Sequence, residues 1–253
     1  MSRVAALLRI VAGNQRDGLR LVDIVEQSGL ETPTAHRVLK ALVDEGLLKR
    51  DELSRRYYLG PLVFELGLAA EPADNLQAVC EQSVIRLAQL SGDVAMLAVR
   101  NGYDTVCLDR REGDHPVRAL TVQVGTRRPL GVGAASLAIL AALPKERIAH
   151  IIEVNALRFW QFNGLTGEML WKLVDATRQA GYAHTRGELF PDIGGVGLAV
   201  RNSQGEAIAA FGISTTITRL SAERVAHLLK LLRSEVAFVE AALRSSQTIS
   251  KSA

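Results

Sequence analysis

The sequence predicts an α+β protein of two parts. A small N-terminal winged helix-turn-helix is followed, after a linker helix, by a larger domain of helices packed on an antiparallel sheet. Three observations predict this fold. Three apolar patterns of helical period precede two short apolar runs around a charged tip. Helical and strand patterns then alternate along the rest of the chain. A polar, proline-containing stretch at residues 71–75 separates the two parts.

The first part begins with three predicted helices. Apolar residues at helical spacing mark a helix near residues 4–11 and a short one near residues 21–25, which Gly29 stops. The third helix is expected to begin at Thr32, where a threonine can cap, and to end at Gly46. A tight turn between the second and third helices is typical of a helix-turn-helix.

Two short strands, at residues 47–51 and 56–59, form the expected wing, and residues 60–70 read as a connecting helix. We therefore expect a winged helix-turn-helix over residues 1–60, a linker helix and hinge over 61–75, and an α+β domain over 76–253. The last of these alternates helix and strand. Its expected helices cover 76–90, 134–143, 145–154, 167–180 and 221–244, and its expected strands cover 94–100, 105–109, 117–124, 198–201 and 207–214.

Composition excludes several classes of protein. Of the 253 residues, 48% are hydrophobic and 23% charged, a balance typical of a globular chain. No apolar stretch reaches the roughly 20 residues that a membrane span needs, and no signal peptide is recognisable. Two isolated cysteines, Cys80 and Cys107, suit a reducing compartment. We expect a cytoplasmic protein without membrane contact. The net charge of +3 permits an anionic partner without requiring one.

The outward face of the third helix predicts contact with double-stranded DNA. Residues 32–40 contain no acidic residue, whereas acids and bases nearly balance from Arg37 to Arg56, with six basic residues against four acidic ones. An acid-free helix face with hydroxyl and guanidinium donors suits the major groove, and basic residues on the hairpin suit the phosphate backbone. The candidate DNA-binding residues are Thr32, Thr34, His36, Arg37, Lys40, Arg55 and Arg56.

Several strings resemble the IclR family of bacterial transcriptional regulators, in the right order and over nearly the whole chain. In the first part they are residues 34–39, 42–50, 57–60 and 65–67. In the second part they are Leu108-Asp109-Arg110, His115-Pro116, Val124-Gly125, Arg128-Pro129-Leu130, Gly181-Tyr182-Ala183, Ser203-Gln204-Gly205 and residues 220–224.

The resemblance implies that residues 1–60 are a DNA-binding domain that reads an operator and that residues 61–75 are a linker. It implies that residues 76–253 are a GAF-like α/β domain for effector binding and oligomerisation. It also implies homodimers, often paired as tetramers. Thr34, His36 and Arg37 match the recognition-helix pattern of the family. Thr32-Pro33 departs from it, which affects the expected phosphate contacts at the helix start.

The candidate effector pocket departs further from the family pattern. Residues 131–137 lack the histidine, threonine and lysine that usually follow the Arg-x-Pro-Leu string, and a late loop has Thr185 and Gly194-Gly195 where an acid and a cysteine are common. Fewer polar anchors and more space favour a larger or less polar effector, such as an aromatic or medium-chain acid. Alternatively, neighbouring side chains fill the space. The candidate effector-binding residues are Met96, Gly131, Val132, Gly133, Ala134, Thr185 and Ser214.

No assembled catalytic or metal-binding pattern appears in the chain. Residues 131–136 and the glycine-rich stretch at 192–197 match neither the dinucleotide nor the P-loop motif. The five histidines show no ligand spacing. Cys107 reads as a core residue rather than a nucleophile, and the aromatic stretch 159–162 as a loop packed on the domain rather than a lid or subunit contact.

We expect no enzyme activity, metal or cofactor. The expected function is a ligand-responsive transcriptional regulator, a repressor of a catabolic operon that senses a small organic or aromatic acid. The alternative is a metabolite-binding protein or enzyme whose winged helix mediates protein contact.

Overall fold

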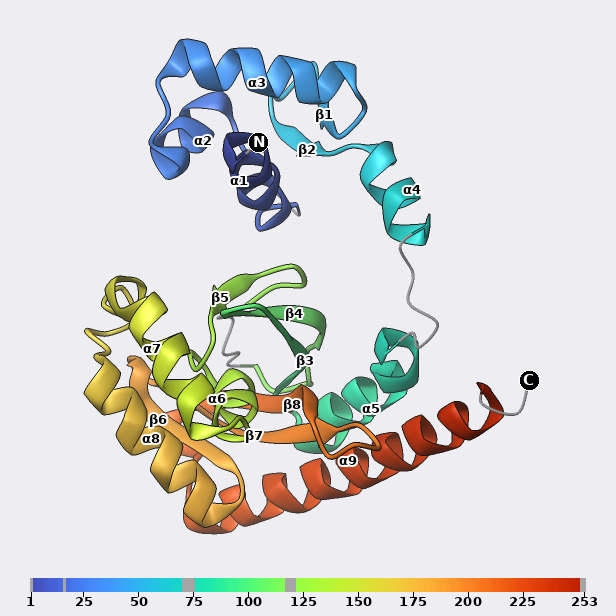
Figure 1. The fold of residues 1–253 in the computed structure, drawn as a ribbon, viewed down its shortest axis with the longest axis vertical. Helices are drawn as coiled ribbons and strands as arrows, with labels where there is room; N and C mark the ends of the chain where they lie inside the picture. The colour runs from blue at the N-terminus through green and yellow to red at the C-terminus, as the bar shows by residue number, and fades with distance from the viewer. Residues whose placement is uncertain (1, 16, 70–75, 117–121, 251–253) are drawn as a thin grey trace. The chain divides into compact units, whose positions relative to one another are not determined.

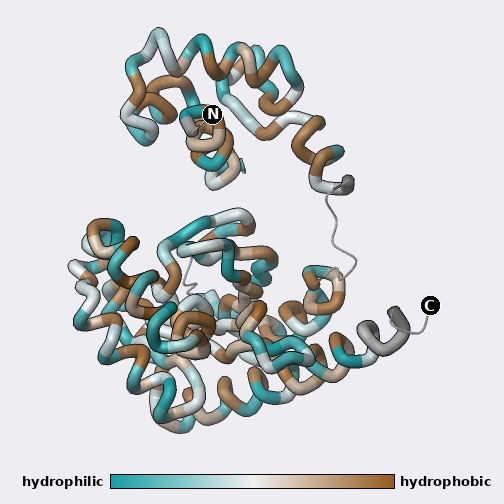
Figure 2. Tube along the Cα trace, viewed as in Figure 1, coloured by the Kyte–Doolittle hydropathy of each residue, from teal (hydrophilic) through white to brown (hydrophobic). Residues whose placement is uncertain are grey.

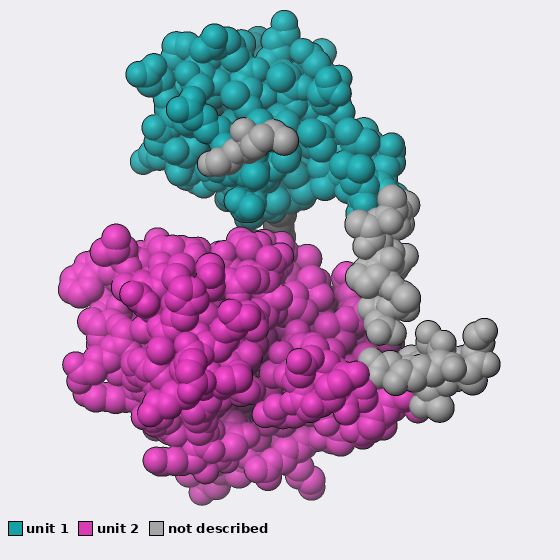
Figure 3. All heavy atoms as spheres, viewed as in Figure 1, with its two compact units in different colours: residues 1–75 teal, residues 76–253 magenta. Residues whose placement is uncertain are grey.

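Three helices and a two-stranded hairpin form the N-terminal unit, and the predicted winged helix-turn-helix is confirmed (Figure 1). The helices are α1 (Ser2–Ala12), α2 (Leu21–Ser28) and α3 (Thr32–Asp44), and the hairpin pairs β1 (Leu48–Arg50) with β2 (Tyr57–Leu59). The helix α4 (Pro61–Ala69) follows, and it is apolar over much of its length (Figure 2). The computed structural model describes residues 2–15, 17–69, 76–116 and 122–250, in two compact units of residues 1–75 and 76–253 (Figure 3).

One apolar cluster holds the N-terminal unit together. The buried residues come from all three helices and both strands: Leu7, Val11, Leu19, Ile24, Leu39, Leu42, Leu48 and Tyr57. Gly29 adopts a left-handed φ of 64° at the end of α2, which lets the chain turn sharply into α3.

The start of α3 differs from the sequence-based expectation. Thr32 does not cap the helix but is its first residue, because Glu31 is the N-cap and its carbonyl accepts the first helical hydrogen bond, from Ala35, at 2.9 Å. Pro33 consequently occupies the second helical position. An N–H in the first turn has no partner within the helix, so this placement of proline loses no hydrogen bond.

The second unit is built on one six-stranded antiparallel sheet, in the order β5-β4-β3-β8-β7-β6. The strands are β3 (Val94–Asn101), β4 (Asp104–Arg111), β5 (Arg127–Pro129), β6 (Ala183–Phe190), β7 (Ile193–Arg201) and β8 (Ala207–Thr216). Helices α5 (Leu76–Ser91) and α9 (Ala222–Ser250), the latter preceded by a 3-10 turn at Ile217–Arg219, cover one face. Helices α6 (Ala134–Ala141), α7 (Lys145–Phe159) and α8 (Gly167–Ala180) cover the other (Figure 1).

The sequence-based expectations for this unit differ from the structure at strands β5, β6 and β7. Residues 117–121 of the strand expected at 117–124 lie outside the described residues, and residues 122–124 belong to no strand; the edge strand β5 follows at Arg127–Pro129 instead. Strand β6 was missed. Thr185 and Gly194-Gly195, expected in a late loop, lie on β6 and β7. The glycines of residues 192–197 suggested a loop, but they lie on strand β7, onto which helix α6 packs.

Two glycines let α6 approach the sheet closely. Gly197 on β7 pairs with Gly212 on β8, and the first turn of α6 lies directly over this pair. A Cβ at Gly197 would collide with the backbone carbonyl of Ala134, and a Cβ at Gly212 would lie 2.9 Å from that of Ala135. Glycine inside a strand is unfavourable unless another backbone must come near, as it does here.

One buried carboxylate connects the start of β3 with the end of β8 and the start of α9. Asp93, just before β3, accepts hydrogen bonds from Thr215 at 2.7 Å and from Arg224 at 2.7 Å, and forms an ion pair with Arg219 at 3.2 Å. Arg224 also donates to the carbonyl of Ser91. The carboxylate is buried but fully paired, as burial of a charge requires. It fixes the start of α9 to the sheet.

None of the helices in the described part of the chain is long and apolar enough to cross a membrane.

The close approach of α6 predicts the effect of a minimal substitution. Gly197→Ala should lower the free energy of unfolding of residues 76–253 by about 1–3 kcal/mol, since the helix backbone must shift to admit one methyl group. Both tryptophans, Trp160 and Trp171, lie in this unit, so urea titration followed by tryptophan fluorescence reports on it alone.

Gly67→Ala is the matched control, because Gly67 is helical and no atom lies within 4 Å of its added Cβ. This control should leave the fluorescence transition in place. Equal midpoints for Gly197→Ala and the parent protein would contradict the packing argument.

Candidate functional site

Helix α3 has a buried apolar face and an exposed polar face. Ala35, Leu39 and Leu42 are buried, which orients the helix. Of the sequence-predicted DNA-binding residues on this helix, Thr34 is half-buried, and Thr32, His36, Arg37 and Lys40 are exposed. The exposed face therefore combines hydroxyl, imidazole, guanidinium and ammonium groups without a carboxylate between residues 32 and 40. Such a face matches base edges and phosphates of duplex DNA.

The two predicted wing arginines differ in what they do. Arg56 is half-buried, and its Nη1 donates to the carbonyl oxygens of Gly18 at 2.7 Å and Asp17 at 3.2 Å. Arg55 is exposed at the tip of the hairpin. Arg56 therefore fastens the wing to the loop before α2, and Arg55 is the wing arginine that extends into solvent.

The wing tip has a defined conformation. The carboxylate of Asp51 accepts hydrogen bonds from the backbone N–H and the hydroxyl of Ser54, both at 2.7 Å. These bonds lower the pKa of Asp51. Arg55 adopts a left-handed φ of 59°, which is uncommon for a residue with a side chain. The acid on the wing is thus a structural element of the turn.

The second unit contains a cavity between the sheet and the start of α6. Six of the seven predicted effector residues line it: Met96, Val132, Gly133, Ala134, Thr185 and Ser214. Gly131 does not. Its N–H donates to the Ser136 hydroxyl at 2.8 Å, and at its φ of 107° an added Cβ would press on Leu140 and Leu170. Gly131 therefore shapes the turn into α6 behind the cavity wall.

Sequence reasoning missed the wall made by β4, β5 and the end of β6. The additional lining residues are Ala98, Thr105, Cys107, Val122, Thr126, Arg128, Ala135, Ser136, Phe190, Ile193 and Gly194. Strand β5 was not predicted, so the alternation of Arg127 and Arg128 across it was not seen. Arg127 pairs with Asp104 at 2.7 Å, whereas Arg128 faces the cavity beside its cross-strand partner Thr105. The sequence signal that could have revealed this wall was the pair of adjacent arginines, Arg127 and Arg128.

Arg128 is the one charged residue among the described residues that line the cavity. Its guanidinium lies 4.6 Å from the ring centre of Phe190 and 5.9 Å from that of Phe162, and the two rings meet edge to face. Burial lowers the pKa of Arg128 to about 10, which leaves it protonated at neutral pH. The cavity thus combines apolar walls, several hydroxyls and one cation, which suits an organic anion.

The aromatic stretch 159–162 packs on the domain in part. Phe159 is fully buried and Phe162 packs beside Phe190, but Trp160 is 70% exposed. The packed-loop interpretation describes the two phenylalanines and not the tryptophan.

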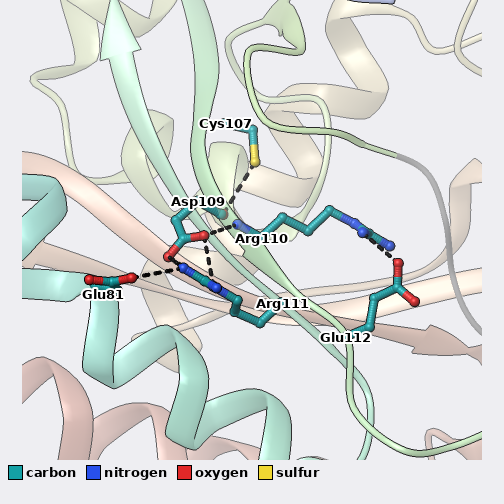
Figure 4. A network of polar contacts seen from close by, with 6 residues as sticks. All are labelled: Glu81, Cys107, Asp109, Arg110, Arg111 and Glu112. Carbon is teal, nitrogen blue, oxygen red and sulfur yellow. Dashed lines mark hydrogen bonds and ion pairs between the residues drawn. The ribbon is translucent and has the colours of Figure 1, made fainter. Parts of the chain in front are cut away.

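A β-bulge keeps the carboxylate of Asp109 away from the cavity. Figure 4 shows this carboxylate in contact with Arg111, which also contacts Glu81. Leu97 pairs with Asp109 and Ala98 with Cys107, so Leu108 is an extra residue on β4. In regular alternation Asp109 would face the same side as Cys107. The bulge instead turns Asp109 to the α5 face, where Arg111 bridges it, at 3.1 Å, to Glu81 of α5, at 3.0 Å.

Cys107 is a buried wall residue. Its thiol donates to the carbonyl of Asp109 at 3.3 Å (Figure 4), and burial raises its pKa to about 12. Within the described ranges, no group of three or more His, Cys, Asp or Glu residues is placed to hold a metal ion.

Two family models cover most of the chain. The model of the bacterial transcriptional regulator IclR C-terminal domain matches residues 72–240, and the IclR helix-turn-helix domain model matches residues 1–52. The chain belongs to the IclR family of bacterial transcriptional regulators. Members of this family are regulators and not enzymes. The IclR chain is accordingly a ligand-responsive DNA-binding regulator, with DNA binding in the helix-turn-helix and effector binding in the C-terminal domain.

Relatives of this IclR chain cover nearly its whole length. It is 26% identical to the HTH-type transcriptional regulator KipR of Bacillus subtilis over 92% of this chain and 91% of KipR. It is 27% identical to the HTH-type transcriptional repressor AllR of Salmonella paratyphi A over 87% of this chain and 81% of AllR. An IclR homolog from Microbacterium hydrocarbonoxydans, crystallised with 4-hydroxybenzoate, has the same fold, with a TM-score of 0.74, 24% identity and coverage of 96% and 98%.

The burial of both cysteines predicts their reactivity. With a pKa of about 12, as burial gives both Cys80 and Cys107, only about 1 in 10,000 thiols is ionised at pH 8. The folded protein should therefore react with a disulfide reagent such as DTNB far more slowly than the urea-unfolded protein, which should release two equivalents. Rapid reaction of one thiol in the folded protein would show that a cysteine is activated.

Proposed function

We propose that this protein is a homo-oligomeric repressor of a catabolic operon, and that its effector is an organic acid with an aromatic or medium-chain body bound in the α6 cavity. The observation that carries this proposal is the lining of the cavity: apolar side chains, uncharged hydroxyls and a single cation, Arg128. A charged carboxylate would gain from that cation, and an apolar body would gain from the walls.

The small residues that line the cavity at the start of α6 support an effector larger than a two- or three-carbon oxoacid. Glycine and alanine at residues 133–135 leave room beside the start of α6. The relative crystallised with 4-hydroxybenzoate supports an aromatic acid, and the relationship to the repressor AllR supports repression.

The proposed mechanism is a coupling free energy between cavity and operator. If the effector binds one arrangement of paired DNA-binding domains better than another, it shifts the population toward or away from the form that binds DNA. Paired domains require an oligomer, and α4 supports one because Phe64 is 70% and Leu66 54% exposed on this helix. Two copies would supply two half-sites on the operator. As a chromosomal regulator, the protein would act in the cytoplasm.

The proposed recognition helix predicts the effect of removing Arg37. Arg37→Ala should weaken binding to a duplex site, selected from a random library with the parent protein, by about 10- to 100-fold, because a bidentate guanidinium contact is lost. Fluorescence anisotropy at several salt concentrations gives the affinity and its salt slope, which counts phosphate contacts.

Arg147→Ala removes the same charge from an exposed position in the second unit and is the control. It should bind DNA as the parent does. Equal affinities of all three proteins would reject Arg37 as a base or phosphate contact. Failure of the parent to select any duplex site would favour the alternative in which the winged helix contacts protein.

The proposed effector class predicts a pattern of ligand binding. Benzoate, 4-hydroxybenzoate, phenylacetate and octanoate should include acids that raise the Tm of the protein and change its affinity for the selected site, because the cavity has apolar walls to contact their bodies. Titration calorimetry with the same acids, and with glyoxylate and pyruvate, measures the preference. Tight binding of glyoxylate or pyruvate with no response to the larger acids would rule out this effector class.

A further inference from the structure

We propose that Arg128 and Thr105 form the anion-recognition subsite of the cavity, so that the carboxylate of the effector binds at the β4–β5 wall and its organic body extends toward α6. This inference rests on the proposed function and names the side chains that recognise the charge of the effector. It makes Arg128 and Thr105 the specificity-determining residues for a carboxylic acid over its uncharged analogue.

The register between β4 and the edge strand β5 places the two side chains together. Thr105 on β4 is the cross-strand partner of Arg128 on β5, and both line the cavity. Paired residues of an antiparallel ladder point to the same face, with Cβ atoms about 5 Å apart. A cation and a hydroxyl at this spacing can hydrogen-bond the two oxygens of one carboxylate.

Thr105 supplies an independent indication that a polar ligand belongs here. It is 8% exposed, and its Oγ1 is buried without a hydrogen-bond partner. A buried hydroxyl left unsatisfied is costly, and a native structure normally has a reason to keep one. Valine has nearly the same shape and would fill the position without that cost. A ligand oxygen that accepts from Oγ1 gives the hydroxyl its role.

The guanidinium of Arg128 is oriented for planar recognition. Phe190 and Phe162 lie 4.6 Å and 5.9 Å from it and restrict its movement. A held guanidinium loses less side-chain freedom when it binds, and its planar fork matches a carboxylate in two parallel hydrogen bonds. Among the lining residues that the structure describes, none is acidic, so no carboxylate of the wall competes for the same cation.

Matched acid and amide ligands test this subsite, because each pair differs in charge while the organic body stays the same. The probes are benzoate, 4-hydroxybenzoate, phenylacetate and octanoate, each with its primary amide. Titration calorimetry on the full chain gives the ratio of affinities within each pair. For the parent protein we expect at least one acid to bind at least about 10-fold more tightly than its amide, since charge-assisted hydrogen bonds are the stronger ones.

The variants separate recognition from folding. Arg128→Met should reduce the acid affinity at least about 10-fold, with little change for the amide, and Arg128→Lys should keep part of the preference. Thr105→Val should weaken the acid several-fold while the Tm of the ligand-free protein stays the same or rises. A merely structural hydroxyl would instead lower the Tm when removed.

Arg127→Met is the matched control on the same strand, since Arg127 pairs with Asp104 at 2.7 Å and does not line the cavity. This control should keep the acid preference of the parent, whether or not its Tm falls.

The outcomes distinguish two failures. If acids bind the parent and Arg128→Met retains the full acid preference, the subsite is wrong and the effector class stands. If no acid in the panel binds the parent, the proposed effector class falls, and the subsite falls with it.

Discussion

The close contact between α6 and the Gly197–Gly212 pair is the constraint on which the second unit depends. Because neither strand carries a side chain at this point, the first turn of the helix lies against the sheet itself. That contact fixes where the helix begins, and residues 132–136 at its start form one wall of the cavity. The same contact lets α6 bury every one of its residues between the sheet and the outer helices. The close approach of the α6 backbone to the sheet thus determines both the packing of the core and the position of the cavity wall.

The electrostatics of the cavity follow from the bulge in β4 and from the alternation of the edge strand β5. The bulge at Leu108 sends Asp109 to the opposite face, and the alternation of β5 sends Arg128 inward while Arg127 pairs with Asp104. The cavity therefore faces one cation and no carboxylate among its described lining residues. This imbalance favours an acid over its amide, because only the acid can form a charge-assisted hydrogen bond with the cation.

The sequence was sufficient for the parts of the fold that follow local rules. The helix-turn-helix could be predicted because its apolar spacing is helical and Gly29 and Gly46 end their helices in left-handed conformations. The first part of strand β7, residues 193–197, could not be predicted, because its glycines are explained by the packing of α6, which is distant in the chain. The α6 side of the candidate cavity was found by comparing residues 131–137 with the family pattern. The β5 side was missed because a three-residue edge strand has no detectable period, so the inward direction of Arg128 depends on its register with Thr105.

The fixed turn at the tip of the wing has a thermodynamic consequence for DNA binding. A flexible basic loop would have to give up conformational freedom on the duplex, and that entropy would be subtracted from its affinity. In this wing the Asp51–Ser54 hydrogen bonds have already restricted the backbone, and Arg55 holds its unusual conformation before any contact is made. The ordering cost is met during folding of the domain, so the attraction that we propose between Arg55 and a phosphate would appear almost undiminished in the binding free energy.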